Sequence, residues 1–332
     1  MKAHFLILLP LIAVIFVCSS NSINKNDKKN SLPNKSLSFV EQNGKLSVKG
    51  VNLVNENDKT IVLRGVSYGW HNWWPRFYNS STVKLFADDW NCKVVRAAMG
   101  VDPKKGYIDD PNFSIECVTQ VVDAAIANGI YVIIDWHSHT IKTDQAITFF
   151  SKMAEKYKDY PNVIYEIFNE PERDSWSDVK TYSIKLIETI RAIDKDNIIL
   201  VGSPHWDQDV HIVADDPILG FDNIMYSLHF YAATHGQFLR ERGDYAIKKG
   251  LPLFVPECAG MEATGDGQIN YSEWQNWLNW MKNNNISWVA WSIADKNESC
   301  SMLLPSASTT GNWKNEDLKE WGKMIKKELS LD

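Results

Sequence analysis

The chain has 332 residues, of which 44% are hydrophobic, so it can build a large core, and α/β barrels of about 250 residues fold as one domain. Its net charge is −6 and no stretch clusters lysine and arginine, which excludes nucleic acid as the expected partner, because phosphate binding needs such clusters. The 14 tryptophans are a high count: some fill the core, and the rest suit flat apolar ligands, including the faces of sugars.

Residues 1–18 have the features of an export signal. Lys2 gives a positive start, and the apolar run from Phe5 to Val17 has the length of a signal-peptide core and is short for a membrane-spanning helix. Cys18 follows directly and resembles the acylated cysteine at a bacterial lipoprotein cleavage site, although Val17 stands where glycine or alanine is usual. We therefore expect an exported protein, either secreted or anchored to the cell envelope through a lipid on Cys18.

Residues 19–36 are polar and contain no aromatic residue, so they cannot bury enough apolar surface to offset the entropy of ordering. We expect a flexible tether there, followed by a folded domain over residues 37–332. The other cysteines, Cys92, Cys117, Cys258 and Cys300, lie far apart without the C-x-x-C spacing of a metal site. An exported protein permits a disulfide between two of them but does not require one.

The folded part opens with a predicted β-hairpin. From Lys45 to Ser67 apolar and polar residues alternate around the turn-forming stretch Asn55 to Asp58, which predicts a hairpin that leads into a strand. Eight short runs of strand-forming residues follow, and their starts are 26 to 39 residues apart, about the length of a β-loop-α-loop unit. The runs are residues 61–67, 92–98, 131–137, 163–170, 197–203, 223–231, 252–258 and 287–293.

The intervals between these runs have helical periodicity. In residues 114–127 the apolar positions fall on one face, and Gly129 stands at the expected end of the helix. Residues 179–193 and 318–329 behave likewise. Eight apolar strands that alternate with helices predict a (β/α)8 TIM barrel preceded by a small hairpin. An open doubly wound sheet is the alternative, disfavoured because no G-x-G-x-x-G opens a helix.

Polar residues stand at the C-terminal ends of six of the eight runs. In a barrel these ends meet at one rim, where active sites are built. The residues are Arg96, Asp135-Trp136-His137, Asn169-Glu170, His229-Phe230-Tyr231, Glu257 and Trp291. Two of them, Glu170 and Glu257, are carboxylates in equivalent positions. Glycoside hydrolysis needs such a pair, one carboxyl to protonate the leaving oxygen and one to attack or to activate water. Each glutamate alone could equally be a helix N-terminal charge or an exposed loop residue.

Six segments resemble the motifs of glycoside hydrolase family 5, most closely those of its subfamily 2 endoglucanases. In chain order they are VVRAAMG, YVIIDWH, NVIYEIFNEP, IMYSLHFYAATHG, LPLFVPECAG and VAWSIADKNESCSML. The resemblance as a whole runs from about residue 40 to the C-terminus. The resemblance implies a retaining endo-β-1,4-glucanase that needs neither a cofactor nor a metal. Its ligand would be a β-glucan polysaccharide or oligosaccharide, and we expect a monomer.

The resemblance also implies roles for individual residues. Glu170 would be the general acid/base, which must hold a proton near neutral pH, and Glu257 the nucleophile, which must stay ionised. Supporting roles fall on Arg96 and Tyr231 beside Glu257, on Asn169 at the sugar 2-hydroxyl, and on His137 and His229 at the cleaved bond. Sugar contacts would come from Trp291, Trp73, Trp206, Lys296 and Glu298.

Three points leave alternatives open. The family's first-strand histidine falls on Gly69. His71 lies two residues further on and would face the same side if the strand continued, so it is the candidate that would replace that histidine in binding substrate. Cys258 stands where tryptophan is common and could bond to Cys300. Glu166 shares the strand parity of Glu170, so it either points into the barrel toward Arg96 or faces outward in a structural role.

Two rival functions remain to be weighed. The H-x-H of His137 and His139 is typical of metal-dependent hydrolases, but it lies on the third run, and Arg96 would place a cation beside it. A non-catalytic sugar-binding lipoprotein would also use tryptophans and a tether, but it has no need for two carboxylates around one bond. Within the enzyme class, β-mannan and xyloglucan are the alternative substrates.

Overall fold

Eight parallel strands close into a barrel in the computed structural model, which describes Met1 and residues 37–331. Each strand pairs with the next one along the chain, and β11 closes the barrel on β3, which confirms the expected (β/α)8 fold. The strands are β3 (Arg64–Tyr68), β4 (Val94–Gly100), β5 (Tyr131–His137), β6 (Val163–Glu166), β7 (Ile199–Val201), β8 (Ile224–Ser227), β10 (Leu253–Ala259) and β11 (Trp288–Ile293). A short β9 (Phe230–Tyr231) pairs with the end of β10.

Every predicted run contains a strand, but three strands end earlier than predicted. β6 stops at Glu166, β7 at Val201 and β8 at Ser227. After β6 the amide of Ile167 still donates to the carbonyl of Leu200 at 3.0 Å, whereas the amide of Asn169 donates to Trp136 at 3.1 Å. The chain thus bends from one neighbouring strand toward the other, and this bend carries Glu170 to the mouth of the barrel.

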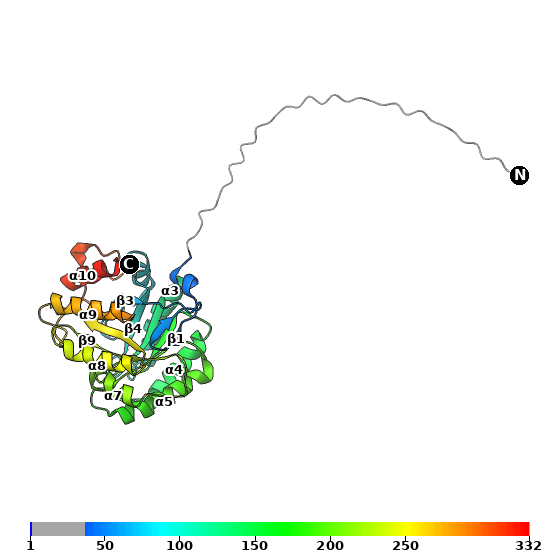
Figure 1. Ribbon diagram of the computed structural model, residues 1–332. Coiled ribbons are helices and arrows are strands. Elements are labelled where there is room, and N and C mark those ends of the chain that lie inside the picture. Colours follow the sequence, from blue (N-terminus) through cyan, green and yellow to red (C-terminus); the bar gives the residue numbers. More distant parts are fainter. Residues whose placement is uncertain (2–36, 332) are drawn as a thin grey trace. The chain divides into compact units, whose positions relative to one another are not determined.

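Helices cover the outside of the strands (Figure 1). The predicted periodic segments lie in α3, α5 and α10, and Gly129 has a φ of 64° just after the end of α3. The helices are α1 (Phe39–Asn43), α2 (Ser80–Asp88), α3 (Pro111–Ala127), α4 (Thr143–Tyr157), α5 (Trp176–Ile193), α6 (Pro204–Asp207), α7 (Val210–Asp215), α8 (Gln237–Lys248), α9 (Tyr271–Asn283) and α10 (Glu320–Leu329). Two single turns of 3-10 helix are η1 (Pro75–Phe77) and η2 (Asn315–Asp317).

The N-terminal hairpin exists, but its turn lies earlier than predicted. β1 (Ser47–Lys49) and β2 (Asn52–Val54) pair antiparallel around Gly50, whose φ of 60° suits glycine. The predicted turn from Asn55 to Asp58 is also present, yet it closes only a single bridge between Val54 and Thr60. The hairpin has a structural use, because Leu46 and Leu53 pack in one buried cluster with residues such as Val94 and Tyr131 at the starts of the barrel strands.

Three further expectations concern the signal peptide, the tether and a disulfide between Cys258 and Cys300. The expected signal peptide and tether, beyond Met1, lie outside the described residues and stay predictions. In the described part of the chain, no helix combines the length and apolarity that crossing a membrane requires. Cys258 and Cys300 are both buried free thiols, so the disulfide considered between them is absent from the structure.

Candidate active site

Arg96 organises the floor of the barrel mouth. It projects from β4, is fully buried, and points inward because it shares the parity of Val94, which packs in the barrel core. Its guanidinium donates to both oxygens of Glu166, at 2.7 and 3.0 Å, and to the Oδ1 of Asn169 at 2.6 Å. It also lies 3.0 Å from a carboxylate oxygen of Asp135. The structure therefore selects the inward alternative for Glu166.

Glu257, from β10, is held by two donors. Its Oε2 accepts from the Nη1 of Arg96 at 3.0 Å, and its Oε1 accepts from the hydroxyl of Tyr231 at 2.7 Å. The side chain is 4% exposed, so one edge of the carboxylate reaches the cleft. Two donors, one of them a permanent cation, stabilise an ionised carboxylate in a fixed orientation.

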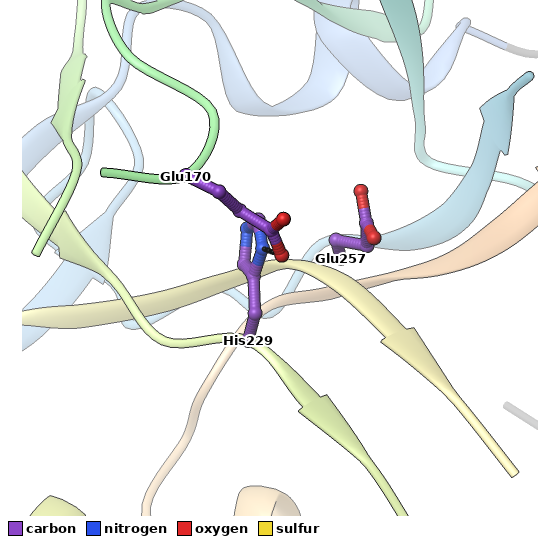
Figure 2. A group of neighbouring side chains, drawn as sticks. All are labelled: Glu170, His229 and Glu257. Atoms are coloured by element: carbon purple, nitrogen blue, oxygen red, sulfur yellow. Dashed lines mark hydrogen bonds and ion pairs between the residues drawn. The ribbon is translucent and has the colours of Figure 1, made fainter. Parts of the chain in front are cut away.

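Glu170 has a different environment, with imidazoles instead of a guanidinium beside it. Its Oε1 lies 2.9 Å from the Nδ1 of His229, and its Oε2 lies 3.5 Å from the Nδ1 of His139. Burial is the main cause that raises the pKa of the Glu170 carboxyl, and the charge of Glu172 adds to it. Figure 2 shows the His229 ring close beside the Glu170 carboxylate, with Glu257 across from it, and one oxygen of each carboxylate lies within 4.8 Å of the other.

Trp291 and His137 form one wall beside this pair. Their rings are parallel, with centroids 5.3 Å apart, and the Nδ1 of His137 lies 2.7 Å from a carboxylate oxygen of Asp135. Trp70 meets the ring of His137 edge-on and stacks near His139. A buried carboxylate behind an imidazole fixes the orientation of the ring, so this wall is preformed.

The cleft extends to both sides of the two glutamates. A hollow of about 490 Å³ on one side is lined by Trp206, Gln208 and His235, and one of about 270 Å³ on the other by Trp73, Trp291 and the ion pair of Lys296 and Glu298. Both hollows include Glu170, Glu257, Tyr231 and His139. Trp73 and Trp206 are 49% and 36% exposed, which suits rings that are to be covered by a ligand. The arrangement is an open groove that crosses the carboxylate pair.

His71 does not belong to the groove, so the expectation that it binds substrate is wrong. Its side chain is fully buried, its Nδ1 accepts from the amide of Gly100 at 3.0 Å, and its Nε2 lies 2.8 Å from the hydroxyl of Ser114. Burial lowers the pKa of the ring to about 4. The strand ends at Tyr68, so the parity argument that placed His71 on the inner face no longer applies.

Sequence reasoning missed several residues at the site. Trp70, His139, Gln208 and His235 line the groove, while Asp135 and Asp207 lie buried behind His137 and His229. The sequence placed Asp135 among the polar strand ends without a role of its own, and His139 entered only through the H-x-H motif. Nothing in the local pattern around Asp207 signals that its side chain turns inward.

The histidines of the rival H-x-H reading do not converge on one site. Among the described residues, the side chains whose donor atoms converge closely enough for a metal ion are Glu170, His229 and Glu257. His137 instead bonds to Asp135, and the Nδ1 of His139 lies 3.5 Å from Glu170. The converging donors already have protein partners in Arg96, Tyr231 and each other, so the geometry is satisfied without an ion.

Comparison with known proteins agrees with this geometry. Residues 54–297 match the profile of the family described as cellulase (glycosyl hydrolase family 5). The chain is similar to an endoglucanase of Clostridium saccharobutylicum, with 43% identity over 86% of this chain and 65% of the relative. It is also similar to endoglucanase Z of Dickeya dadantii, with 44% identity over 85% of this chain and 65% of the relative. The chain thus spans less than two thirds of the length of these two curated relatives.

Solved structures have the same fold. A structure from Cytophaga hutchinsonii superimposes with a TM-score of 0.87 and 45% identity, and the match covers 89% of this chain and 97% of the other. The catalytic domain of Thermobifida fusca endoglucanase Cel5A, in a variant bound to cellotetraose, gives a TM-score of 0.84 at 30% identity over 88% and 99% of the two chains. The family match over residues 54–297 spans all eight barrel strands, from β3 to β11.

Proposed function

Because this chain belongs to glycosyl hydrolase family 5, the cellulase family, we propose that it is an endo-acting β-1,4-glucanase that cleaves internal glucosidic bonds with retention of configuration. The observation that carries the proposal is the distance between the two glutamates. One oxygen of Glu170 lies within 4.8 Å of one oxygen of Glu257. Retaining glycosidases hold their carboxyl groups about 5 to 5.5 Å apart, whereas inverting enzymes leave about 6.5 to 9.5 Å for a water molecule.

The partners of each glutamate assign its role. Glu257 faces Arg96 and Tyr231, which favour the ionised carboxylate that attacks the anomeric carbon. Glu170 is nearly buried and has a raised pKa, so it can carry the proton that the leaving oxygen needs. In the second step Glu170 takes a proton from water, the water oxygen bonds to the anomeric carbon, and the bond to Glu257 breaks.

The groove suggests how a glucan chain would lie. Trp291 and the pair Lys296–Glu298 would bind the sugars that keep the anomeric carbon, and Trp206 would stack on the leaving part of the chain. The Oδ1 of Asn169 accepts from Arg96, which leaves the amide nitrogen of Asn169 to donate to the sugar 2-hydroxyl. A groove open at both ends suits cleavage within a chain rather than at its end. The cellotetraose bound to the Thermobifida fusca relative supports a β-1,4-glucan as ligand.

A substrate panel tests the proposal. We expect carboxymethylcellulose and mixed-linkage β-glucan to lose viscosity rapidly while few reducing ends appear, and the first product seen by proton NMR to be the β-anomer. Glu257→Gln serves as the inactive control. Faster hydrolysis of mannan or xyloglucan would instead assign one of those substrates. An initial α-anomer would exclude the retaining mechanism, and the absence of new reducing ends on every polysaccharide would favour a sugar-binding protein.

A further inference from the structure

Asp207 is a buried carboxylate of the site that the proposed mechanism does not use. Its side chain is fully buried, and its Oδ1 accepts from the amide of Ser203 at 2.5 Å. Its Oδ2 has no hydrogen bond and lies 3.3 Å from the Nε2 of His229, which has none either. Buried polar atoms are nearly always hydrogen-bonded. The Oδ2 of Asp207 and the Nε2 of His229 face each other, so we infer that one of them carries a proton that it donates to the other.

His229 connects Asp207 to Glu170. Its Nδ1 lies 2.9 Å from the Oε1 of Glu170, while its Nε2 faces Asp207 on the opposite side of the ring. A neutral imidazole carries its proton on one nitrogen and accepts at the other. Burial lowers the pKa of His229 to about 4, so the ring is neutral at neutral pH and can link two carboxyl groups.

The backbone is built to hold Asp207 in this position. His205, Trp206 and Asp207 have φ values of 58°, 55° and 57°, a left-handed conformation that residues with a Cβ atom rarely adopt three times in a row. The result is that Trp206 turns into the groove while Asp207 turns inward. The amide of His229 also donates to the carbonyl of Asp207 at 3.2 Å, which ties the two residues together.

We propose that Asp207, His229 and Glu170 form one proton-sharing set, in which Asp207 is a positioning residue that acts on Glu170 through the His229 ring. In one arrangement Asp207 is protonated toward Nε2, and Nδ1–H donates to the Glu170 carboxylate. In the other, Asp207 is ionised, Nε2 carries the proton and Glu170 is protonated. The conversion breaks the O–H of Asp207 and the Nδ1–H, and it forms the Nε2–H and the O–H of Glu170, so protons and charge balance within the set.

The set should keep its shared proton to higher pH than Glu170 would alone. Loss of the shared proton leaves Asp207 and Glu170 both ionised. Two negative charges on coupled, buried carboxylates repel each other, so this loss needs a higher pH. Burial raises the pKa of Asp207 and of Glu170 in addition. The other titratable and charged groups that act on the set are Arg96, Asp135, His137, His139, Glu166, Glu172, Tyr231, His235 and Glu257. A substitution at position 207 leaves all of these in the chain.

This inference rests on the proposed function, and the pH profile of the variant Asp207→Asn tests it. Asparagine tolerates the left-handed backbone and keeps the shape of the side chain, but it cannot share a proton. We expect the alkaline limb of kcat/KM on a soluble β-glucan to move down by about one pH unit, because this limb reports the acid Glu170. Asp209→Asn is the matched control. It removes another carboxylate of the same loop, one that accepts a hydrogen bond from Arg242 instead of facing His229. The alkaline limb of this variant should coincide with that of the unmodified protein.

A second readout does not depend on turnover. NMR titration of glutamate labelled with ¹³C at the carboxyl carbon, assigned through Glu170→Gln, should show the Glu170 transition at lower pH in Asp207→Asn. If this variant does not fold, Asp207→Ser replaces it in both measurements. An unshifted limb and an unshifted Glu170 transition in a folded, active variant would overturn the inference. Inactivity of the unmodified protein on every glucan would overturn the proposed function instead, while the NMR titration would still decide on the proton-sharing set.

Discussion

Glu170 and Glu257 have the same side chain, and their partners give them different chemistry. The carboxylate of Glu257 receives hydrogen bonds from a guanidinium and a phenol, which favour its charge. Glu170 lies beside the imidazoles of His229 and His139, and burial raises the pKa of its carboxyl group. A nucleophile and an acid thus lie within reach of one bond, as double displacement requires.

Removal of each glutamate should therefore give a distinct defect. Glu257→Ala should reduce turnover by at least about 10⁴-fold, because no covalent intermediate can form. Azide should restore activity by attacking from the vacated face, and the product should be the α-glycosyl azide. Turnover and product anomer by NMR are the measurements.

Glu170→Ala should discriminate between leaving groups. Hydrolysis of a soluble glucan should fall by about 10²- to 10⁴-fold, because the leaving sugar needs a proton. The first step on a dinitrophenyl cellobioside should be nearly unaffected, since its leaving group is stable as an anion. Azide with the activated substrate should give the β-glycosyl azide. If the two variants exchanged these behaviours, the roles of the two glutamates would be reversed.

At the scale of one element, the segment between β7 and α7 positions both the rim and the interior of the site. Three left-handed residues in α6 set Trp206 on the groove and Asp207 behind His229. A right-handed helical turn at this place would rotate these neighbouring side chains about the axis in the opposite direction. The segment therefore contributes through its backbone conformation as much as through its side chains.

Truncation of the rim tryptophan should affect only substrates that reach it. Trp206→Ala should raise KM for cellotetraose about fivefold, close to 1 kcal/mol, because an exposed ring loses its stacking partner. Hydrolysis of an aryl cellobioside, whose sugars would lie on the Trp291 side, should be unchanged. Tyr160→Ala is the control, since Tyr160 is 43% exposed and precedes β6 at the opposite end of the barrel. An equal loss on both substrates for Trp206→Ala would mean that the loop itself had been disturbed.

At the scale of the whole molecule, the interior holds carboxyl groups whose pKa is raised and histidines whose pKa is lowered. Burial raises the pKa of Asp135 to about 8 and that of Glu166 to about 7. Burial lowers the pKa of His71, His229 and His235 to about 4 each. The carboxyl groups stabilise the fold at low pH and lose this contribution as pH rises through 7 and 8, whereas the histidines lose theirs as pH falls from about 6.5 to 4.

The free energy of unfolding should therefore be greatest near pH 6. Between about pH 4 and 6.5 the two kinds of group offset each other, and above 6.5 the carboxyl groups act alone. We expect a decrease on the order of 2 kcal/mol between pH 6.5 and 8, measured by urea unfolding with tryptophan fluorescence. The decrease should be smaller in Asp135→Asn and unchanged in Asp196→Asn, whose side chain is half exposed beside Lys45. Parallel pH curves for all three proteins would contradict this account.

Much of this protein follows from the sequence by itself. The spacing of eight apolar runs predicts the barrel, because each strand and helix must bury one face and its period is written in consecutive residues. The polar ends of the runs then predict which side chains meet at the rim, and the structure brings Glu170, Glu257, Arg96, His229 and Tyr231 together there. The turn of the hairpin was misplaced, because two turn signals lie close together and only packing selects between them.

Tertiary structure decided the features that depend on contacts across the barrel or on irregular backbone. Glu166 points inward because Arg96, 70 residues away, provides a partner for its charge. His71 is buried because the chain leaves the strand before it, so the period of two that predicts facing side chains no longer holds. Asp207 reaches His229 through three left-handed residues, a conformation that no periodic pattern encodes. Local periodicity specifies faces, but long-range partners and loop dihedrals specify which charges meet.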